Sequence, residues 1–328
     1  MKRSGNSTLY SFIILLTAAL SACKKEEKTL VTTVTPTFDR SLVHALMAPL
    51  RSAPQTFTVN AGTLVEVEGV KGTKLTFYPN SFKNAAGDTI RNGPVEIRLL
   101  EMYSLGDMIA NRASTLAGPN PLKSGGQIYI TARQGGQEVF TTGYGIRFRQ
   151  PAASTQSMNI YFGNRNNADS LVLWNIEPIG LSASSTRMDS ISNTYYYQFD
   201  SVVKFNFVNC DHDIFKGSTI PRTTITTFIP EKTFTPANTT VWIVYPGVNA
   251  IGYMDGYTYT SYNANYEAKF SASNIPVGEK FHVIMISILD NKWHYAELRN
   301  QTMDQNHMLA LTPSPSTWAE ILTKLSTL

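Results

Sequence analysis

The residues most capable of chemistry, by type and spacing, form the run Asn209-Cys210-Asp211-His212-Asp213. Carboxylates and an imidazole together can bind a cation or transfer protons. Neighbouring side chains in a strand point to opposite faces, however, so Asp211 and His212 do not converge without a special loop. Asn and Asp that follow a strand also form turns through their own side chains. The pattern therefore predicts a structural turn and no metal site.

The familiar catalytic and cofactor-binding spacings do not occur in this sequence. There is no Gly-x-Ser-x-Gly elbow, Cys-x-x-Cys pair, Walker loop or Gly-x-Gly-x-x-Gly run. The five histidines are scattered, without a His-x-x-x-His pair: His44, His212, His282, His294 and His307. We therefore predict a non-catalytic protein without a cofactor. A hydrolase with a dispersed active site is an alternative, because a triad can be assembled from residues far apart in the chain.

Tyrosines gather in one Gly-, Asn- and Thr-rich stretch, which contains Tyr257, Tyr259 and Tyr262. A tyrosine platform can stack on sugar rings, since each ring offers an apolar face and a polar edge. Tyr also favours strands, so the same stretch is typical of a β-hairpin packed on its neighbours. The hairpin is the interpretation we favour, and a glycan platform is the best binding hypothesis.

Composition narrows the class of partner. Charged residues make up 16% of the 328 residues, below the ~25% typical of soluble domains, which suits a β protein with a Ser-, Thr- and Asn-rich surface. The formal net charge is +4, and removal of a leader containing Lys2 and Arg3 leaves +2 (4 minus 2). No basic cluster is interleaved with aromatic residues, so we predict no binding to nucleic acid.

The first residues have the pattern of a secretory leader. Lys2 and Arg3 precede an apolar run from Leu9 to Leu20, and small residues stand just before Cys23. The run is shorter than the ~20 apolar residues that span a bilayer, and a charge cluster follows it. We therefore predict a signal peptide over residues 1–22.

The segment Leu20-Ser21-Ala22-Cys23 resembles the lipobox of bacterial lipoproteins. The resemblance implies cleavage before Cys23 and lipidation of its thiol, which anchors the chain in a membrane because each buried methylene contributes ~0.8 kcal/mol. Cys210 then has no partner for an intrachain disulfide. We predict that Cys210 is buried as a small apolar side chain.

The charged residues after the cysteine, Lys25, Glu26 and Glu27, resemble the lipoprotein export signal of Bacteroidota. The resemblance implies an outer-membrane lipoprotein that faces outward; a solvated charge run, with the protein on the periplasmic face, is the alternative. Four triplets of Asp, Ser or Thr, and an apolar residue also resemble the O-glycosylation motif of that group, although turn-to-strand junctions use the same residues. Their acceptor positions are Thr89, Ser170, Ser190 and Ser201.

Short alternating segments predict a mainly β fold of two β-sandwich modules after a lipidated tether over residues 23–52. The first module is expected over residues 53–150. Its segments Gly72–Phe82 and Gly93–Ile97 resemble the ZU5-like β-sandwich. The His-Phe-Ser triplet at which some members of that family cleave themselves is absent. Other segments resemble Bacteroidota lipoproteins, a likeness that carries no activity with it: Glu101-Met102-Tyr103, Asp107-Met108-Ile109 and Ser124-Gly125-Gly126.

A second sandwich-like module is expected over residues 151–328, after the Pro- and Ala-rich segment that begins at Gln150. Thr317 and Glu320 have capping-box spacing and predict a short C-terminal helix. Its apolar residues lie at helical intervals and are expected to seal the end of the sandwich: Trp318, Ile321, Leu322 and Leu325.

These patterns lead to one hypothesis and two alternatives. The chain is expected to be a lipid-anchored outer-membrane lipoprotein with a non-catalytic binding or scaffolding role. Its expected partners are the membrane, through the lipid, and a glycan or an outer-membrane protein. The alternatives are a glycan-binding component of a nutrient-uptake system and the hydrolase with a dispersed site.

Overall fold

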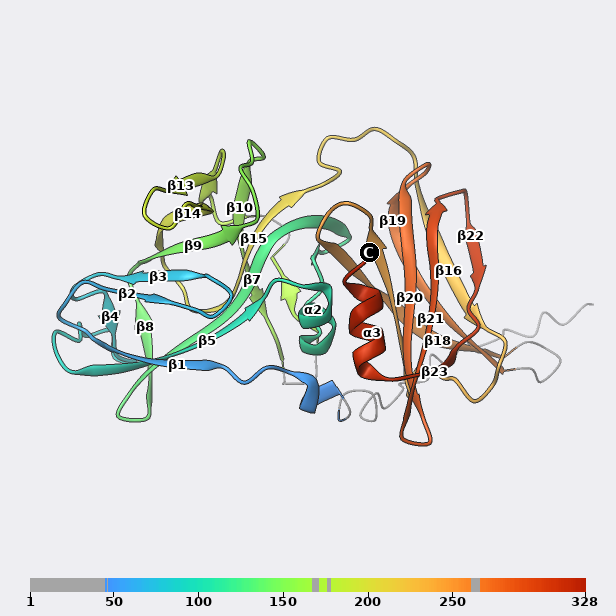
Figure 1. Ribbon diagram of the computed structural model, residues 1–328, viewed down its shortest axis with the longest axis horizontal. Coiled ribbons are helices and arrows are strands. Elements are labelled where there is room, and N and C mark those ends of the chain that lie inside the picture. The colour runs from blue at the N-terminus through green and yellow to red at the C-terminus, as the bar shows by residue number, and fades with distance from the viewer. Residues whose placement is uncertain (1–44, 46, 167–170, 176–177, 261–265) are drawn as a thin grey trace, which may run out of the picture. The chain divides into compact units, whose positions relative to one another are not determined.

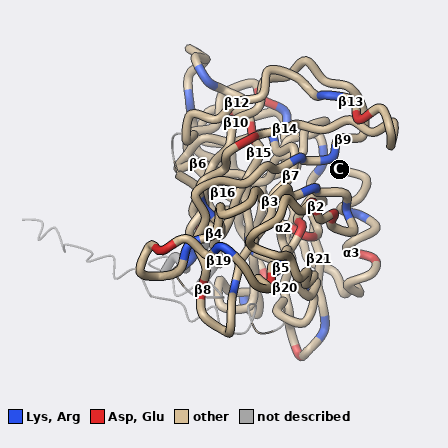
Figure 2. The backbone as a smooth tube through the Cα atoms, turned by 90° about the vertical axis from the view of Figure 1, so that its left-hand side faces the viewer, with Lys and Arg blue, Asp and Glu red and all other residues tan. Residues whose placement is uncertain are grey.

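Strands dominate the chain, so the predicted mainly β class is confirmed (Figure 1). The computed structural model describes residues 45, 47–166, 171–175, 178–260 and 266–328, without the side chains of residues 256–260 and 266–267. The sheets form sandwich-like or barrel-like arrangements, followed by a short C-terminal helix. Lysines, arginines and acidic residues are interspersed along the chain among a majority of uncharged residues (Figure 2).

The largest sheet has ten strands. Its main path runs through β1 (Gln55–Asn60), β5 (Pro94–Met102), β7 (Asn120–Gln134), β15 (Asn206–Asp213), β10 (Met158–Asn164), β11 (Leu173–Trp174) and β6 (Leu116–Ala117). Three strands pair beside this path: β12 (Ser182–Ala183) with β10, β8 (Gln137–Thr141) with β7, and β4 (Phe82–Lys83) with β8. Burial alternates along the first part of β5: Val95, Ile97 and Leu99 are buried and Arg98 is exposed. One face of this strand therefore meets the core.

A five-stranded sheet packs on that core and completes the first sandwich. Its order is β13 (Arg187–Asp189), β14 (Thr194–Val202), β9 (Tyr144–Gln150), β3 (Lys74–Phe77) and β2 (Val65–Glu68). The shared core includes Phe77 and Phe148 from this sheet and Ile130 and Val208 from the larger one. Pairs of large apolar side chains that exclude water between two sheets are the main source of stability in such a layer.

The expected boundary between residues 150 and 151 does not separate the sheets. Strand β7 pairs with β15, and β9 pairs with β14, so segments from both sides of that boundary share both sheets of the sandwich. The Pro- and Ala-rich segment after Gln150 is a loop between β9 and β10. The Pro- and Ala-rich composition is that of a loop that connects the two sheets of the sandwich. The passage to the next sheet lies between Asp213 and Arg222.

The remaining strands form one eight-stranded sheet. Its order is β22 (His307–Ala310), β16 (Arg222–Ile229), β19 (Tyr266–Pro276), β18 (Ala250–Thr260), β17 (Thr239–Tyr245), β20 (Lys280–Leu289), β21 (Lys292–Thr302) and β23 (Ser314–Ser316). Strand β17 is buried along its whole length: Val241 and Ile243 belong to the core on one face, and Trp242 and Val244 to the core on the other. Both faces are covered, so its sequence from Val241 to Tyr245 is continuously apolar rather than alternating.

Helices cover the second face of this sheet. A 3-10 turn, η1 (Ala48–Leu50), precedes α2 (Leu105–Asn111), and α3 (Trp318–Leu325) ends the chain. Figure 1 shows α2 and α3 side by side against the sheet. The predicted capping box of α3 is present, since the Thr317 side chain accepts from Glu320 N and Glu320 accepts from Thr317 N. Ile321 and Leu325 are buried in the same core as Trp242.

No helix in the described part of the chain is long and apolar enough to cross a bilayer. The predicted signal peptide over residues 1–22 lies outside the described residues.

Candidate functional site

The segment Ser124-Gly125-Gly126 forms a bulge in the middle of β7. Asn209 pairs with Gln127 and Asp211 with Ser124, so Gly125 and Gly126 together oppose the single residue Cys210. Gly126 has φ of 130°, and a Cβ there would lie 2.6 Å from the Tyr103 ring. A larger residue does not fit this position without displacing the ring.

A pocket of about 540 Å³ lies beside this bulge. It is built by β7, by the end of β9 with the loop that follows it, by β14, and by the turn between β17 and β18. Its lining comprises Tyr103, Lys123, Ser124, Gly125, Arg149, Gln150, Pro151, Ala152, Ala153, Ser154, Met158, Tyr197, Gly247, Val248 and Asn249. The volume is within the range of about 300–1,000 Å³ found for small-molecule sites.

Hydrogen bonds between the sandwich and the eight-stranded sheet fix the wall of this pocket. Ser124 N donates to Asn249 O over 2.9 Å, and Asn249 Nδ2 donates to Tyr103 O over 3.0 Å. On the opposite wall, the Tyr197 hydroxyl lies 2.8 Å from both Ser154 Oγ and Gln156 O. The loop after β9 is thereby tied to β14, and the pocket is formed before any ligand arrives.

The charges in the lining are of one sign. Lys123 and Arg149 are its charged residues, and no Asp, Glu, His or Cys belongs to it. Neither side chain makes a hydrogen bond or ion pair with another residue in the described ranges. The tyrosines add no negative charge near neutral pH, because burial raises the pKa of both Tyr103 and Tyr197.

The run predicted as a turn lies instead at the end of strand β15, and the turn starts at Asp213, whose Oδ1 accepts from Phe215 N. The strand continues because its backbone groups pair with β7 and β10 on both sides. Asp211 is buried; one of its oxygens accepts from Asn209 Nδ2 and Oδ1 has no partner in the described structure. Burial raises its pKa. Cys210 points into the sandwich core, as its predicted role requires.

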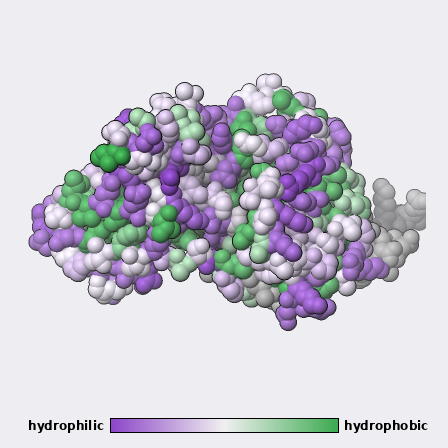
Figure 3. Space-filling view, viewed as in Figure 1, coloured by the Kyte–Doolittle hydropathy of each residue, from purple (hydrophilic) through white to green (hydrophobic). Residues whose placement is uncertain are grey.

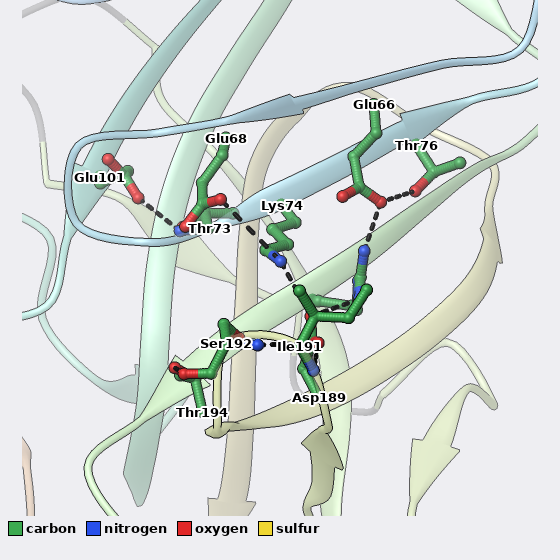
Figure 4. A network of polar contacts seen from close by, with 11 residues as sticks. Glu66, Glu68, Thr73, Lys74, Thr76, Glu101, Asp189, Ile191, Ser192 and Thr194 are labelled. Atoms are coloured by element: carbon green, nitrogen blue, oxygen red, sulfur yellow. Dashed lines mark hydrogen bonds and ion pairs between the residues drawn. The ribbon is translucent and has the colours of Figure 1, made fainter.

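A network of charged and polar side chains crosses one face of the five-stranded sheet (Figure 4). Lys74 Nζ lies 2.9 Å from Asp189 Oδ2, and Arg147 lies 3.5 Å from the same atom and also pairs with Glu66. Both cations lie over the Tyr196 ring, 5.2 and 5.6 Å from its centroid. Lys74 and two backbone N–H groups lower the pKa of Asp189 to about 2. Because both cations are paired, this cluster holds neighbouring strands together and offers no free charge to a ligand.

The predicted site residues that the structure describes lie on several separate elements. Thr89 is half-buried and accepts from Lys83 Nζ; Ser190 is exposed in the turn between β13 and β14; Ser201 is exposed at a bulge in β14. Tyr257 and Tyr259 lie in β18, and their side chains fall outside the description. The remaining positions lie outside the described residues: Cys23, Lys25, Glu26, Glu27, Ser170 and Tyr262.

No group of three or more His, Cys, Asp or Glu side chains within the described ranges is placed to hold a metal ion. A scan against protein-family models finds no match. A search of curated proteins likewise finds none.

Sequence reasoning missed the pocket, although one signal was present. A Gly-Gly doublet within an otherwise strand-like run predicts a bulge or a close approach of another group. Lys123 and Arg149 carry no such signal, since single cations on strands are ordinary surface residues. Only the pairing of β7 with β15 and the docking of Asn249 place them on one pocket.

Proposed function

We propose that this chain is a lipid-anchored outer-membrane lipoprotein, facing outward, whose role is to bind a small ligand without catalysis. The pocket beside the β7 bulge carries this proposal. It is large enough for a small organic molecule, and hydrogen bonds from two sheets preform it. Its lining supplies cations, tyrosine rings and apolar side chains, but no general acid or base of the Asp, Glu or His type.

The distribution of exposed apolar residues favours a binding pocket rather than a flat protein–protein interface. Large apolar side chains with high exposure occur singly on distant elements, such as Val70, Ile191 and Met308. On the face shown in Figure 3, hydrophobic residues are scattered among hydrophilic ones. Isolated apolar residues of this kind are normal, whereas a docking face for a protein partner usually presents a contiguous patch.

The anchor rests on the sequence, through Cys23 and the charged residues that follow it. Protease treatment of intact producing cells tests the location. Cleavage of the wild-type chain, lost when Glu26 and Glu27 are both changed to Ala, supports outward export. Protection of the wild type instead indicates the periplasmic face. Uptake of labelled palmitate by the wild type and not by Cys23→Ser supports the lipid anchor, and no uptake by the wild type contradicts it.

The binding role is tested with a panel of neutral and charged small fragments, observed by NMR, against the full chain in lipid nanodiscs. Ala153→Trp fills the pocket from its exposed rim and should abolish binding. Ala86→Trp, in an exposed turn far along the chain, is the matched control and should leave binding unchanged. Fragments that bind Ala153→Trp as well as the wild type place the ligand elsewhere and contradict the proposed pocket.

A further inference from the structure

We infer that the pocket beside the β7 bulge takes a small organic anion with an apolar body, held at its charged end by Lys123 and Arg149. This inference rests on the proposed binding function and names its ligand class. Four observations support it. The charged residues of the lining are both positive, they have no ion-pair partner among the described residues, the rest of the lining is largely apolar, and the nearby carboxylates are buried outside the lining.

The first two observations concern charge. Lys123 is half-buried and Arg149 lies at the exposed rim of the same pocket. Elsewhere in the sandwich, cations such as Lys74 and Arg147 are matched by carboxylates within ion-pair distance. The lining of the pocket contains no carboxylate that could neutralise these two positive charges. A concave site with charges of one sign focuses the field and raises the local concentration of the opposite ion.

Arginine and lysine also suit the proposed head group. A guanidinium donates two parallel hydrogen bonds to a carboxylate, and an ammonium adds a point charge. Each such hydrogen bond to a charged group raises affinity by roughly tenfold or more.

The remaining lining is suited to carbon and hydrogen rather than to further charge. Pro151, Ala152, Ala153, Met158 and Val248 line the pocket together with the Tyr197 ring. An inorganic anion would leave these groups facing water. A ligand with an apolar body would cover them and remove their apolar surface from water, which favours binding.

The carboxylate behind the bulge does not cancel the positive lining. Asp211 pairs with Ser124 across the strands, is fully buried, and is not part of the lining. Burial favours its uncharged form. Glu101, also buried, accepts from Thr73 N and Lys71 N, so backbone donors already occupy it.

The test compares two probes of nearly the same shape, 4-(trifluoromethyl)benzoate, which is an anion, and 4-(trifluoromethyl)benzamide, which is neutral. Binding to the full chain in lipid nanodiscs is followed by fluorine NMR, with empty nanodiscs as the blank. We expect the benzoate to bind at least about tenfold more tightly than the benzamide. Raising the salt concentration should weaken the benzoate and not the benzamide.

Variants then assign the contact. Lys123→Gln with Arg149→Gln should remove the preference for benzoate, while a control with the same change of net charge, Arg91→Gln with Lys292→Gln, should keep it. Both control residues are exposed and lie outside the pocket lining. Thermal melting of each variant checks that the fold is intact. Inorganic phosphate should displace the benzoate only weakly, because it lacks an apolar body.

The outcomes separate the two proposals. Equal binding of benzoate and benzamide, both lost in Ala153→Trp, overturns the anion preference and leaves the binding function standing. A benzoate preference that survives in the Lys123 and Arg149 double variant overturns the assigned contacts. Displacement of the benzoate by phosphate at an equal concentration contradicts the proposal that the ligand has an apolar body. No binding of either probe up to millimolar concentration overturns the proposed ligand class, and a fragment panel without a single hit in the pocket overturns the binding function as well.

Discussion

Thr115 and Ile251, 136 residues apart, are joined by reciprocal hydrogen bonds. Thr115 N donates to Ile251 O over 2.8 Å, and Ile251 N donates to Thr115 Oγ1 over 2.8 Å. Thr115 lies between α2 and β6, and Ile251 lies in β18, so these bonds connect the sandwich to the eight-stranded sheet. Both residues are fully buried. The two sheets are therefore held by directed polar contacts as well as by apolar packing.

Thr115→Val should destabilise the whole described fold. Valine keeps the shape of threonine but cannot accept from Ile251 N, which is then buried without a partner. The expected loss is about 1–3 kcal/mol in the free energy of unfolding. Urea denaturation measures it. Thr56→Val, at an exposed position on β1, is the control and should change stability by less than about 0.5 kcal/mol. Equal effects of the two changes would show that the contact contributes nothing.

Gly126→Ala should be more costly than a glycine substitution in open space. Its Cβ would lie 2.6 Å from the Tyr103 ring, whereas Gly135, which also has positive φ, has no atom within 4 Å of a built Cβ. The φ of 130° at Gly126 is also harder for alanine to adopt than the φ of 56° at Gly135, so the clash and the larger backbone strain both add to the cost at Gly126. We expect Gly126→Ala to lose about 1–3 kcal/mol more than Gly135→Ala, by urea denaturation. Indistinguishable variants would mean that Tyr103 moves aside freely.

Asp189 should contribute to acid sensitivity. Its pKa falls from an ordinary 3.8 to about 2 in the fold, chiefly through Lys74. Its stabilising contribution is therefore present above pH 3.8 and lost as the pH falls through about 2. Asp189→Asn should be less stable than the wild type near neutral pH, and the gap should close across that window. Denaturant midpoints at several pH values measure it.

The control for Asp189→Asn is Asp290→Asn, on the exposed turn between β20 and β21. Asp290 forms no ion pair with another described residue, so its variant shows the effect of losing an exposed carboxylate that holds no cation. A gap between Asp189→Asn and the wild type that stays constant to pH 2 would contradict the ion-pair assignment.

The contribution of Asp211 to stability should depend on pH in the opposite direction to that of Asp189. Because its pKa in the fold is raised above 3.8, its contribution is fully present below pH 3.8 and is lost as the pH rises through the raised value. Asp211→Asn keeps an acceptor for Asn209 Nδ2 and removes the titration. Its stability relative to the wild type should therefore increase with pH, as measured by thermal melting. Parallel curves for the two proteins would contradict a raised pKa.

Local sequence patterns determined much of the secondary structure. The alternation around Val95 and Ile97 gives a half-buried strand because successive side chains point to opposite faces. Thr317 and Glu320 start α3 because their side chains satisfy backbone N–H groups that a helix leaves free. Such effects act over a few residues and can be predicted without the rest of the chain.

Long-range pairing was decided only by the tertiary structure. Strand β15 enters the sheet between β7 and β10, which places the segment around Asp211 in a strand instead of a turn and moves the expected boundary after residue 150. Lys123, Arg149 and Asn249 meet at one pocket because three distant segments dock. A single side chain carries no local sign of such a meeting, since the free energy that drives it comes from burial and hydrogen bonds shared across the whole fold.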